Sequence, residues 1–330
     1  MTILVISIIV IALTFDFLNG MNDAANSIAT VVSTKVLTPN QGVAWAAFWN
    51  FAAYFIFGVT VAKTIGKGIV DSHIINEYVV LSALIGAIIW VYTCTHFGLP
   101  ISVSHSLIGG LIGPALLIGG TQSLIAAGIL KVTLFIFLSP IIGFLLGYLI
   151  MIATMWIFRR RSPRSVDGIF RVMQLVSSAV FSLGHGSNDA QKTIGIITIL
   201  LFSTGFLKGE FMVPTWVAVA SYVTIGAGTL AGGWKVIKTL GTSLTHLKPV
   251  QGFCAETAGA LTVIGSTLGG IPVSTTHTIT GSIMGVGSVK RLSAVRWGVA
   301  GNIVLAWVLT IPATIVMSGG TYLIIKLFVK

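Results

Sequence analysis

Apolar segments follow one another along the whole chain, and this pattern limits the fold more than any other feature of the sequence. They lie near residues 2–18, 22–36, 43–62, 78–95, 103–119, 132–157, 173–184, 193–206, 213–231, 254–268, 275–286 and 297–317. Most approach the roughly 17–25 residues that a membrane-crossing helix needs, whereas several are too short to cross alone. Only 8% of the 330 residues are charged, against roughly 25% in a soluble domain. We therefore predict an all-α polytopic membrane protein with ten to twelve helical segments, some of them broken or re-entrant.

The stretches between these segments are too short for a soluble catalytic domain or a nucleotide-binding module. Any transport by this chain is therefore driven by something other than ATP. The first segment has no basic region before it and no cleavage site of small residues, so we expect a retained helix and not a signal peptide. Cys94 and Cys254 lie in apolar segments without metal-ligand neighbours, which favours a packing role.

Basic residues give the chain a net charge of +11, and they lie almost entirely between the apolar segments. The densest cluster is FRRRSPR at residues 158–164. A nucleic-acid patch is one interpretation, but an arginine run beside a membrane helix more often sets orientation and contacts lipid headgroups. We therefore expect a multi-pass protein of the cell membrane, with this cluster in the cytoplasm and no nucleic-acid partner.

Two sequence blocks occur twice in the same order, which indicates an internal duplication. GMNDAAN at residues 20–26 matches GSNDAQK at residues 186–192, at an offset of 166. GLPISVSHSLIGGLIG at residues 98–113 matches GIPVSTTHTITGSIMG at residues 270–285, at an offset of 172. Either motif alone would be weak, but both together, twice and in order, are a strong signal.

The duplication divides the chain into a first transmembrane repeat, residues 1–158, an Arg-rich linker, residues 159–171, and a second repeat, residues 172–330. If each repeat crosses the membrane an odd number of times, the second is inverted relative to the first. Such repeats commonly build a binding site from interrupted helices at their interface near the midplane. Both termini would then lie outside the cell, opposite the linker, although Lys326 and Lys330 weigh against this orientation.

Four acidic residues, Asp16, Asp23, Asp189 and Glu256, lie in apolar surroundings. Even the lower estimates put a charged side chain at the centre of a membrane helix at a cost of about 2.5–3.5 kcal/mol. We therefore expect partners or bound cations inside the bundle. Hard cations take oxygen ligands, and the candidates that offer them here are Asn22, Asp23, Asn26, Asn188, Asp189 and Glu256.

Two interpretations of the Asn-Asp pairs stay open. A helix can unwind at Gly20 and Gly186, beside the pairs, and free backbone carbonyls for a cation. Alternatively each pair caps the start of a helix, and capping and ion binding can coexist. Lys192 takes the position of Asn26 in the repeat and lies three residues after Asp189, on the same helical face. It either neutralises Asp189 or touches a bound anion, and we favour the first.

The second repeated block predicts an anion site. Pro100 and Pro272 suit the first turn of a helix, because proline has no N–H to leave unpaired. The hydroxyl groups that follow would lie beside free backbone N–H groups, at the positive end of the helix dipole, where anions bind. These candidates are Ser102, Ser104, Ser274, Thr275 and Thr276. Two such blocks facing each other would hold one tetrahedral oxyanion.

His105 and His277 directly follow these hydroxyls and are also candidates for the anion site. The alternative is a structural histidine that donates a hydrogen bond to a carbonyl. His96 and His185 are expected to be structural. Glu256 has no acidic counterpart in the first half, so the site is expected to be asymmetric.

These motifs resemble the inorganic phosphate transporter (PiT) family, which includes sodium–phosphate symporters. The resemblance rests on GMNDAANS, LPISVSHSLIGG, GHGSNDAQKTIG and IPVSTTHTITGSIMG and covers nearly the full length. It implies an inverted-repeat membrane fold, a phosphate held near the midplane by the two Pro-x-Ser-x-Ser/Thr-His blocks, and cations, with sodium at Asp23 and Asp189, near the Asn-Asp pairs. Animal members carry a glutamate where this chain has Asn50, and a large cytoplasmic insertion that is missing here. These departures fit a compact bacterial form and leave the coupling ion open.

We therefore predict a secondary active transporter that imports inorganic phosphate by symport with sodium or a proton, sodium being favoured, and that uses no other cofactor. Relatives that carry sulfate provide the closest alternative, but monohydrogen phosphate can donate its proton to a carboxylate, and sulfate near pH 7 cannot. A channel would need polar residues through its whole depth, and a hydrolase an asymmetric nucleophile–base pair. The duplicated polar blocks fit neither. The oligomeric state is left open, with a homodimer as one option.

Overall fold

Residues 1–209 and 212–329 are described by the computed structural model, and they form helices and no β-strand. The α-helices are α1 (Ile3–Ser33), α2 (Pro39–Ala52), α3 (Thr60–Lys67), α4 (Glu77–Phe97), α5 (Val103–Gly119), α6 (Ala126–Ile157), α7 (Pro163–Ser203), α8 (Thr215–Ala231), α9 (Trp234–Lys238), α10 (Pro249–Leu268), α11 (Thr275–Ser288) and α12 (Trp297–Phe328). The described residues thus confirm the all-α fold.

Several of these helices can cross a bilayer. Within the described residues six are long and apolar enough, or seven if α8 and the helical segment after it form one span with a 66° bend. The six are α1, α4, α5 with the turn after it, α6, α7 and α12. Leucines on α6 and α12 are exposed, among them Leu145, Leu149, Leu305 and Leu309, as expected for surfaces covered by lipid chains. The chain is a multi-pass membrane protein.

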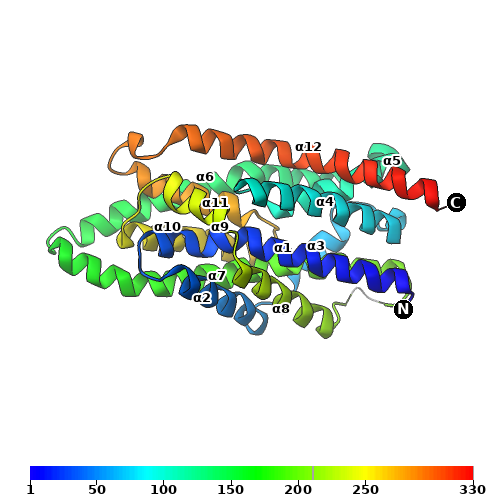
Figure 1. The fold of residues 1–330 in the computed structure, drawn as a ribbon, viewed down its shortest axis with the longest axis horizontal. Coiled ribbons are helices and arrows are strands. Elements are labelled where there is room, and N and C mark those ends of the chain that lie inside the picture. Colours follow the sequence, from blue (N-terminus) through cyan, green and yellow to red (C-terminus); the bar gives the residue numbers. More distant parts are fainter. Residues whose placement is uncertain (210–211, 330) are drawn as a thin grey trace.

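The order of helices is the same in the two halves of the chain. Each half has a long helix, a broken pair, a helical hairpin and a second long helix: α1, α2–α3, α4–α5 and α6, then α7, α8–α9, α10–α11 and α12. In Figure 1 the α4–α5 hairpin lies toward the end of the bundle that holds the termini, and the α10–α11 hairpin lies toward the opposite end. Two repeats of opposite orientation would have this arrangement, but their inversion across a membrane stays a prediction.

The two halves pack against each other through matching contacts. Helix α5 packs along α12 and α11 packs along α6, so each hairpin contacts the last long helix of the other half. Likewise α1 packs against α8, while α7 packs against α2 and α3. The two long helices α1 and α7 also contact each other in the interior, where both repeats surround them. Side chains at this crossing are therefore shielded from water and lipid.

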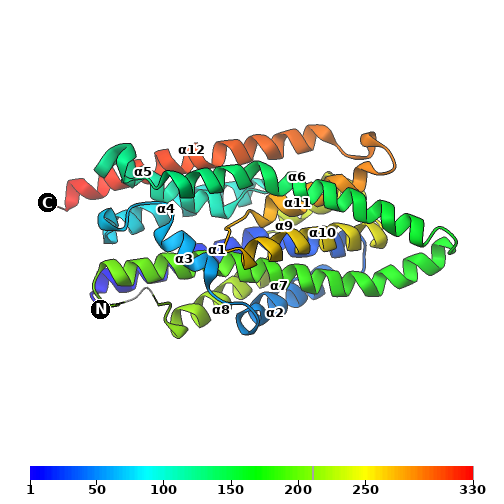
Figure 2. The same ribbon diagram turned by 180° about the vertical axis from the view of Figure 1, so that it is seen from behind.

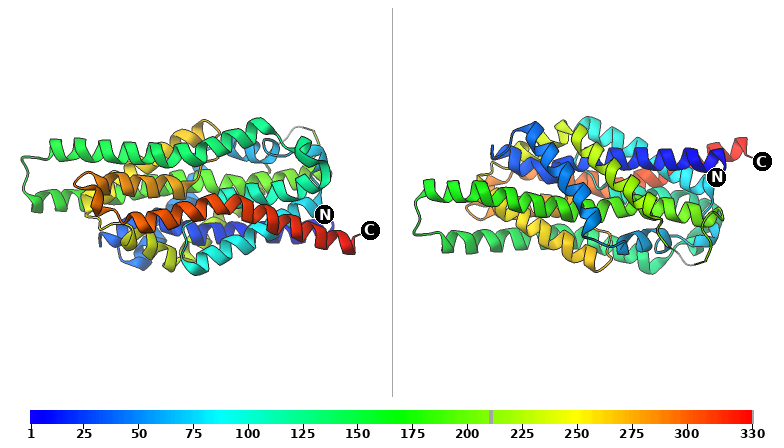
Figure 3. Two further views of the ribbon diagram at one scale, coloured as in Figure 1. Left: turned by 90° about the horizontal axis from the view of Figure 1, so that it is seen from above. Right: turned by 90° about the horizontal axis from the view of Figure 1, so that it is seen from below.

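The two ends of the bundle differ in what they carry. Figures 1 and 2 show the N-terminus and the end of α12 at one end, and the connection between α6 and α7 at the other. Helices α6 and α7 extend beyond the rest of the bundle there (Figure 3). Helix α7 begins at Pro163, so most of the predicted linker is helical. The side of the membrane on which each end lies stays a prediction, and Lys330 lies outside the described residues.

Helices α1 and α7 continue without a break through the Asn-Asp pairs. The expected unwinding at Gly20 and Gly186 is therefore wrong, and so is the interpretation of the pairs as helix caps. The glycines serve close packing instead. A Cβ atom on Gly20 would lie 2.2 Å from the carbonyl oxygen of Ile225 in α8, and one on Gly186 would lie 2.4 Å from that of Asn50 in α2.

Replacing Gly20 by alanine should destabilise the protein, because the added methyl group meets backbone that cannot move aside. Overpacking of this kind typically costs about 1–3 kcal/mol. Gly301→Ala on α12 is the matched control, since nothing lies within 4 Å of its added Cβ. Thermal unfolding of the purified variants in detergent should show a lower midpoint for Gly20→Ala alone. Equal midpoints for the two variants would contradict the packing role.

Candidate functional site

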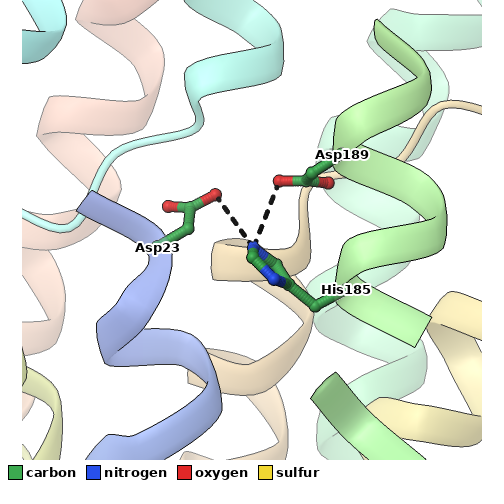
Figure 4. Close-up of side chains that lie close together, drawn as sticks. All are labelled: Asp23, His185 and Asp189. Atoms are coloured by element: carbon green, nitrogen blue, oxygen red, sulfur yellow. Dashed lines mark ion pairs between the residues drawn. The ribbon is translucent and has the colours of Figure 1, made fainter. Parts of the chain in front are cut away.

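The crossing of α1 and α7 brings the two repeated aspartates together around one histidine. Figure 4 shows Asp23 on α1 facing His185 and Asp189 on α7. The Nε2 atom of His185 lies 3.8 Å from Asp23 Oδ2 and 3.5 Å from Asp189 Oδ2. All three side chains are buried, and one ligand-type atom from each lies within 4.8 Å of the others. Two carboxylates and an imidazole nitrogen at this spacing can hold a cation.

His185 is a site residue that the sequence analysis treated as structural. Its Nδ1 atom lies 3.1 Å from Asn50 Oδ1, and the Asn50 amide donates to Thr229 Oγ1 at 2.9 Å. Because the Thr229 hydroxyl already donates to a carbonyl oxygen, Asn50 presents its oxygen to the ring, and Nδ1–H of His185 donates to it. The Nε2 atom faces the carboxylates. The spacing of His185 and Asp189, four residues apart on one helical face, was the signal that could have identified it.

The first turn of α11 contacts both carboxylates. The Thr275 hydroxyl lies 3.4 Å from Asp23 Oδ2 and 3.3 Å from Asp189 Oδ2, and can donate to either. Thr276 donates to Asp23 Oδ1 at 3.1 Å. The amide of Asn26, one turn along α1, donates to the hydroxyls of Thr275 at 3.3 Å and Thr276 at 2.9 Å. The Asn-Asp motif of the first half, residues 20–26, therefore contacts the repeated motif of the second half that carries the hydroxyl groups, residues 270–285.

Lys192 links α7 to both hairpin tips. Its ammonium donates to Asp189 Oδ1 at 2.6 Å, to the carbonyl oxygen of Val273 at 3.2 Å and to the hydroxyl of Ser104. The side chain is buried, with 1% of its surface exposed. The ion pair with Asp189 is the first of the two roles predicted for this lysine.

Ser102 and Ser274 are the N-caps of α5 and α11. Each hydroxyl accepts a hydrogen bond from the backbone N–H three residues later, at 3.3 Å in α5 and 3.2 Å in α11. Pro100 and Pro272 therefore lie before the helices, and their predicted place in the first turn is wrong, because the serines define where each helix begins. The hairpin tips meet, since Ser104 Oγ lies 3.5 Å from the carbonyl oxygen of Val273.

Asn22 and Asn188 occupy equivalent places in the two halves. Asn22 donates to Thr95 Oγ1 at 2.7 Å, and Asn188 donates to Thr267 Oγ1 at 2.9 Å. These two threonines also match at the offset of 172. The Oδ1 atoms of both asparagines, and that of Asn26, are buried and have no hydrogen-bond partner. Buried acceptors of this kind are usually satisfied, so these three are available to a cation or water.

His105 and His277 lie against each other behind the hairpin tips. Their rings meet edge to face with centroids 4.9 Å apart, and the ring of His277 stacks on Trp307 at 3.8 Å. His277 Nδ1 lies 3.4 Å from the carbonyl oxygen of Ile136. The contact with a carbonyl oxygen favours the structural alternative for His277, whereas Nδ1 of His105 is buried without a hydrogen-bond partner.

Comparison with known proteins identifies the family. Residues 19–318 match the phosphate transporter family. The chain belongs to that family. It is 54% identical to a probable low-affinity inorganic phosphate transporter of Rhizobium meliloti (strain 1021), over 97% of this chain and 96% of the relative. Identity to a protein of the same description from Bacillus subtilis (strain 168) is 40%, over 98% of each chain.

A solved structure described as "The sodium-dependent phosphate transporter" matches with a TM-score of 0.88 and 27% identity, over 99% of this chain and 100% of that one. The predicted family is thus confirmed. Because the family and these relatives are transporters, the prediction that the chain is not an enzyme is confirmed as well.

In this transporter Glu256 belongs to a second polar cluster. Its carboxylate accepts hydrogen bonds from Thr30 at 2.6 Å, from Gln174 at 3.0 Å and from Ser177. Thr30 lies about two helical turns along α1 from Asp23, so the structure does not place Glu256 with the aspartate pair. Its three donors are all neutral, and a role for Glu256 in cation binding stays a prediction.

The two aspartates should differ in their contribution to stability. Asp189→Asn leaves the ammonium of Lys192 buried without its carboxylate, and breaking a buried ion pair in this way costs about 3–5 kcal/mol. Asp23→Asn leaves no such cation behind and should cost less. Unfolding midpoints of the purified single variants measure the difference.

The double variant Asp189→Asn/Lys192→Met serves as the control, because it removes both charges. It should recover part of the stability that Asp189→Asn loses. A double variant less stable than Asp189→Asn would show that the ion pair is not the cause.

Proposed function

We propose that this transporter imports inorganic phosphate by symport with a cation, and that sodium is favoured over protons. The observation that carries the proposal is the meeting of two helix N-termini, one from each half, beside two buried aspartates. An anion site and a cation site in direct contact are what coupled transport of phosphate and a cation requires.

The anion would bind where the tips of α5 and α11 meet. Both helices direct the positive end of their dipole and the N–H groups of their first turn toward this place. The hydroxyl groups of Ser104, Thr275 and Thr276 lie here, and Lys192 adds a positive charge. Ser102 and Ser274 hold their helix starts in position and have further acceptor capacity.

The charges explain why a cation should accompany the anion. Asp23 and Asp189 with Lys192 leave one negative charge uncompensated when His185 is neutral. Monohydrogen phosphate would add two more in a region from which water is excluded. Such a combination is strongly unfavourable unless cations enter with it. The unpartnered oxygens of Asn22, Asn26 and Asn188 are suitable ligands for a hard cation.

Access to the site requires movement of the hairpins. In the described structure Asp23, Asp189 and Thr275 are at most 2% exposed, and their hydroxyl and carboxylate groups contact one another. Substrate would separate these groups when it binds. A closed site of this kind suits a carrier that alternates between two openings, and it disfavours a channel with a continuous polar pore.

Reconstituted protein should accumulate labelled phosphate when a sodium gradient is imposed. Sodium and proton gradients applied separately, each in liposomes of matched membrane potential, identify the coupling ion. Arsenate should compete with phosphate, because it has the same shape and protonation, while sulfate should compete weakly. Uptake indifferent to both gradients would overturn the coupling, and inhibition by sulfate as strong as by arsenate would favour the sulfate alternative.

A further inference from the structure

The two halves of the site carry different residues at one pair of equivalent positions, 26 and 192. Asn26 lies three residues after Asp23, and Lys192 lies three residues after Asp189. The hydroxyls that they contact are also equivalent, because Ser104 and Thr276 match at the offset of 172. Asn26 donates to Thr276 at 2.9 Å, and Lys192 donates to Ser104. The same contact between the halves is therefore made once by an amide and once by an ammonium.

The surroundings of the Lys192 ammonium are those of a bound cation. A carboxylate oxygen of Asp189, a hydroxyl oxygen of Ser104 and the carbonyl oxygen of Val273 surround it. These are the three kinds of oxygen that hard cations take as ligands in proteins. The nitrogen is charged and buried, so it compensates the negative charge of Asp189 as a metal ion at that point would.

The corresponding place in the first half lacks such a charge. Asp23 there has Asn26 beside it, and the Oδ1 atom of Asn26 is buried without a hydrogen-bond partner. An amide can offer this oxygen to a cation, whereas a lysine ammonium offers donors only. The first half can therefore receive a free cation between Asp23 and Asn26. The second half carries its cation on the chain.

We propose that the ammonium of Lys192 is a tethered substitute for a coupling cation, so that this chain binds one free cation fewer per phosphate than it would with asparagine at position 192. This inference rests on the proposed cation-coupled transport. It makes Lys192 a residue that sets the number of coupling ions. Lys192→Asn restores the symmetry of the repeat and should open a second sodium site beside Asp189.

The test compares wild type, Lys192→Asn and Lys192→Met in purified form. Sodium replaces potassium at constant ionic strength, and the rise in the unfolding midpoint measures sodium binding, since a ligand of the folded state stabilises it. Lys192→Asn should show a larger sodium-dependent rise than wild type. Lys192→Met removes the charge but supplies no oxygen, so any rise that it gains should be smaller than that of Lys192→Asn. Lys192→Gln carries the same carbonyl oxygen on a longer side chain and replaces the asparagine variant if that one does not fold.

Transport gives the second measurement. The ratio of labelled sodium to labelled phosphate taken up by liposomes should increase by one sodium ion in Lys192→Asn relative to wild type. A sodium response that is the same in wild type and Lys192→Asn would overturn the inference. Failure of wild type to transport phosphate would instead overturn the proposed function, while the comparison of sodium binding would still decide the role of Lys192.

Discussion

Two carboxylates at the centre of an apolar bundle, Asp23 and Asp189, constrain the arrangement of everything around them. A carboxylate in such surroundings is too costly to leave without donors or a cation. The groups that meet this need come from the second half of the chain: Lys192 from α7, and Thr275 and Thr276 from the start of α11. The helices that must approach one another are therefore those that carry these side chains. Polar interactions here select the geometry, since lipid gives helices little hydrophobic reason to associate.

Close packing makes this meeting of helices feasible. Glycines on α1 and α7 let neighbouring backbones approach to distances that any side chain would prevent. The same principle holds along the hairpins, where a Cβ on Gly281 of α11 would lie 2.2 Å from the carbonyl oxygen of Pro140 in α6. Small residues in membrane interfaces commonly serve this purpose. The fold thus combines a closely packed frame with hairpin tips that contact each other and the carboxylates through hydrogen bonds, and in the proposed mechanism substrate displaces these tips.

Local patterns in the sequence predicted the helices, the duplication and most of the polar groups that meet at the centre, because hydropathy and repeated motifs are properties of the chain itself. Contacts between residues far apart in the chain could not be predicted from these local patterns. Only the approach of Ile225 shows that Gly20 serves packing and not unwinding. The repeat does not indicate a role for His185, because the equivalent position in the first half holds Asn19. Glu256 joined the cation candidates by composition, but its donors come from α1 and α7, which no sequence pattern indicates.

Direct contact between an anion site and a cation site is the central claim, and it requires that each ligand strengthens the binding of the other. Equilibrium binding of labelled phosphate to the purified transporter, over a range of sodium concentrations at constant ionic strength and at several pH values, measures this coupling without a membrane gradient. The phosphate dissociation constant should fall as the coupling cation increases, and phosphate should raise the affinity for that cation by the same factor. A phosphate dissociation constant that changes with neither sodium nor pH would contradict the claim.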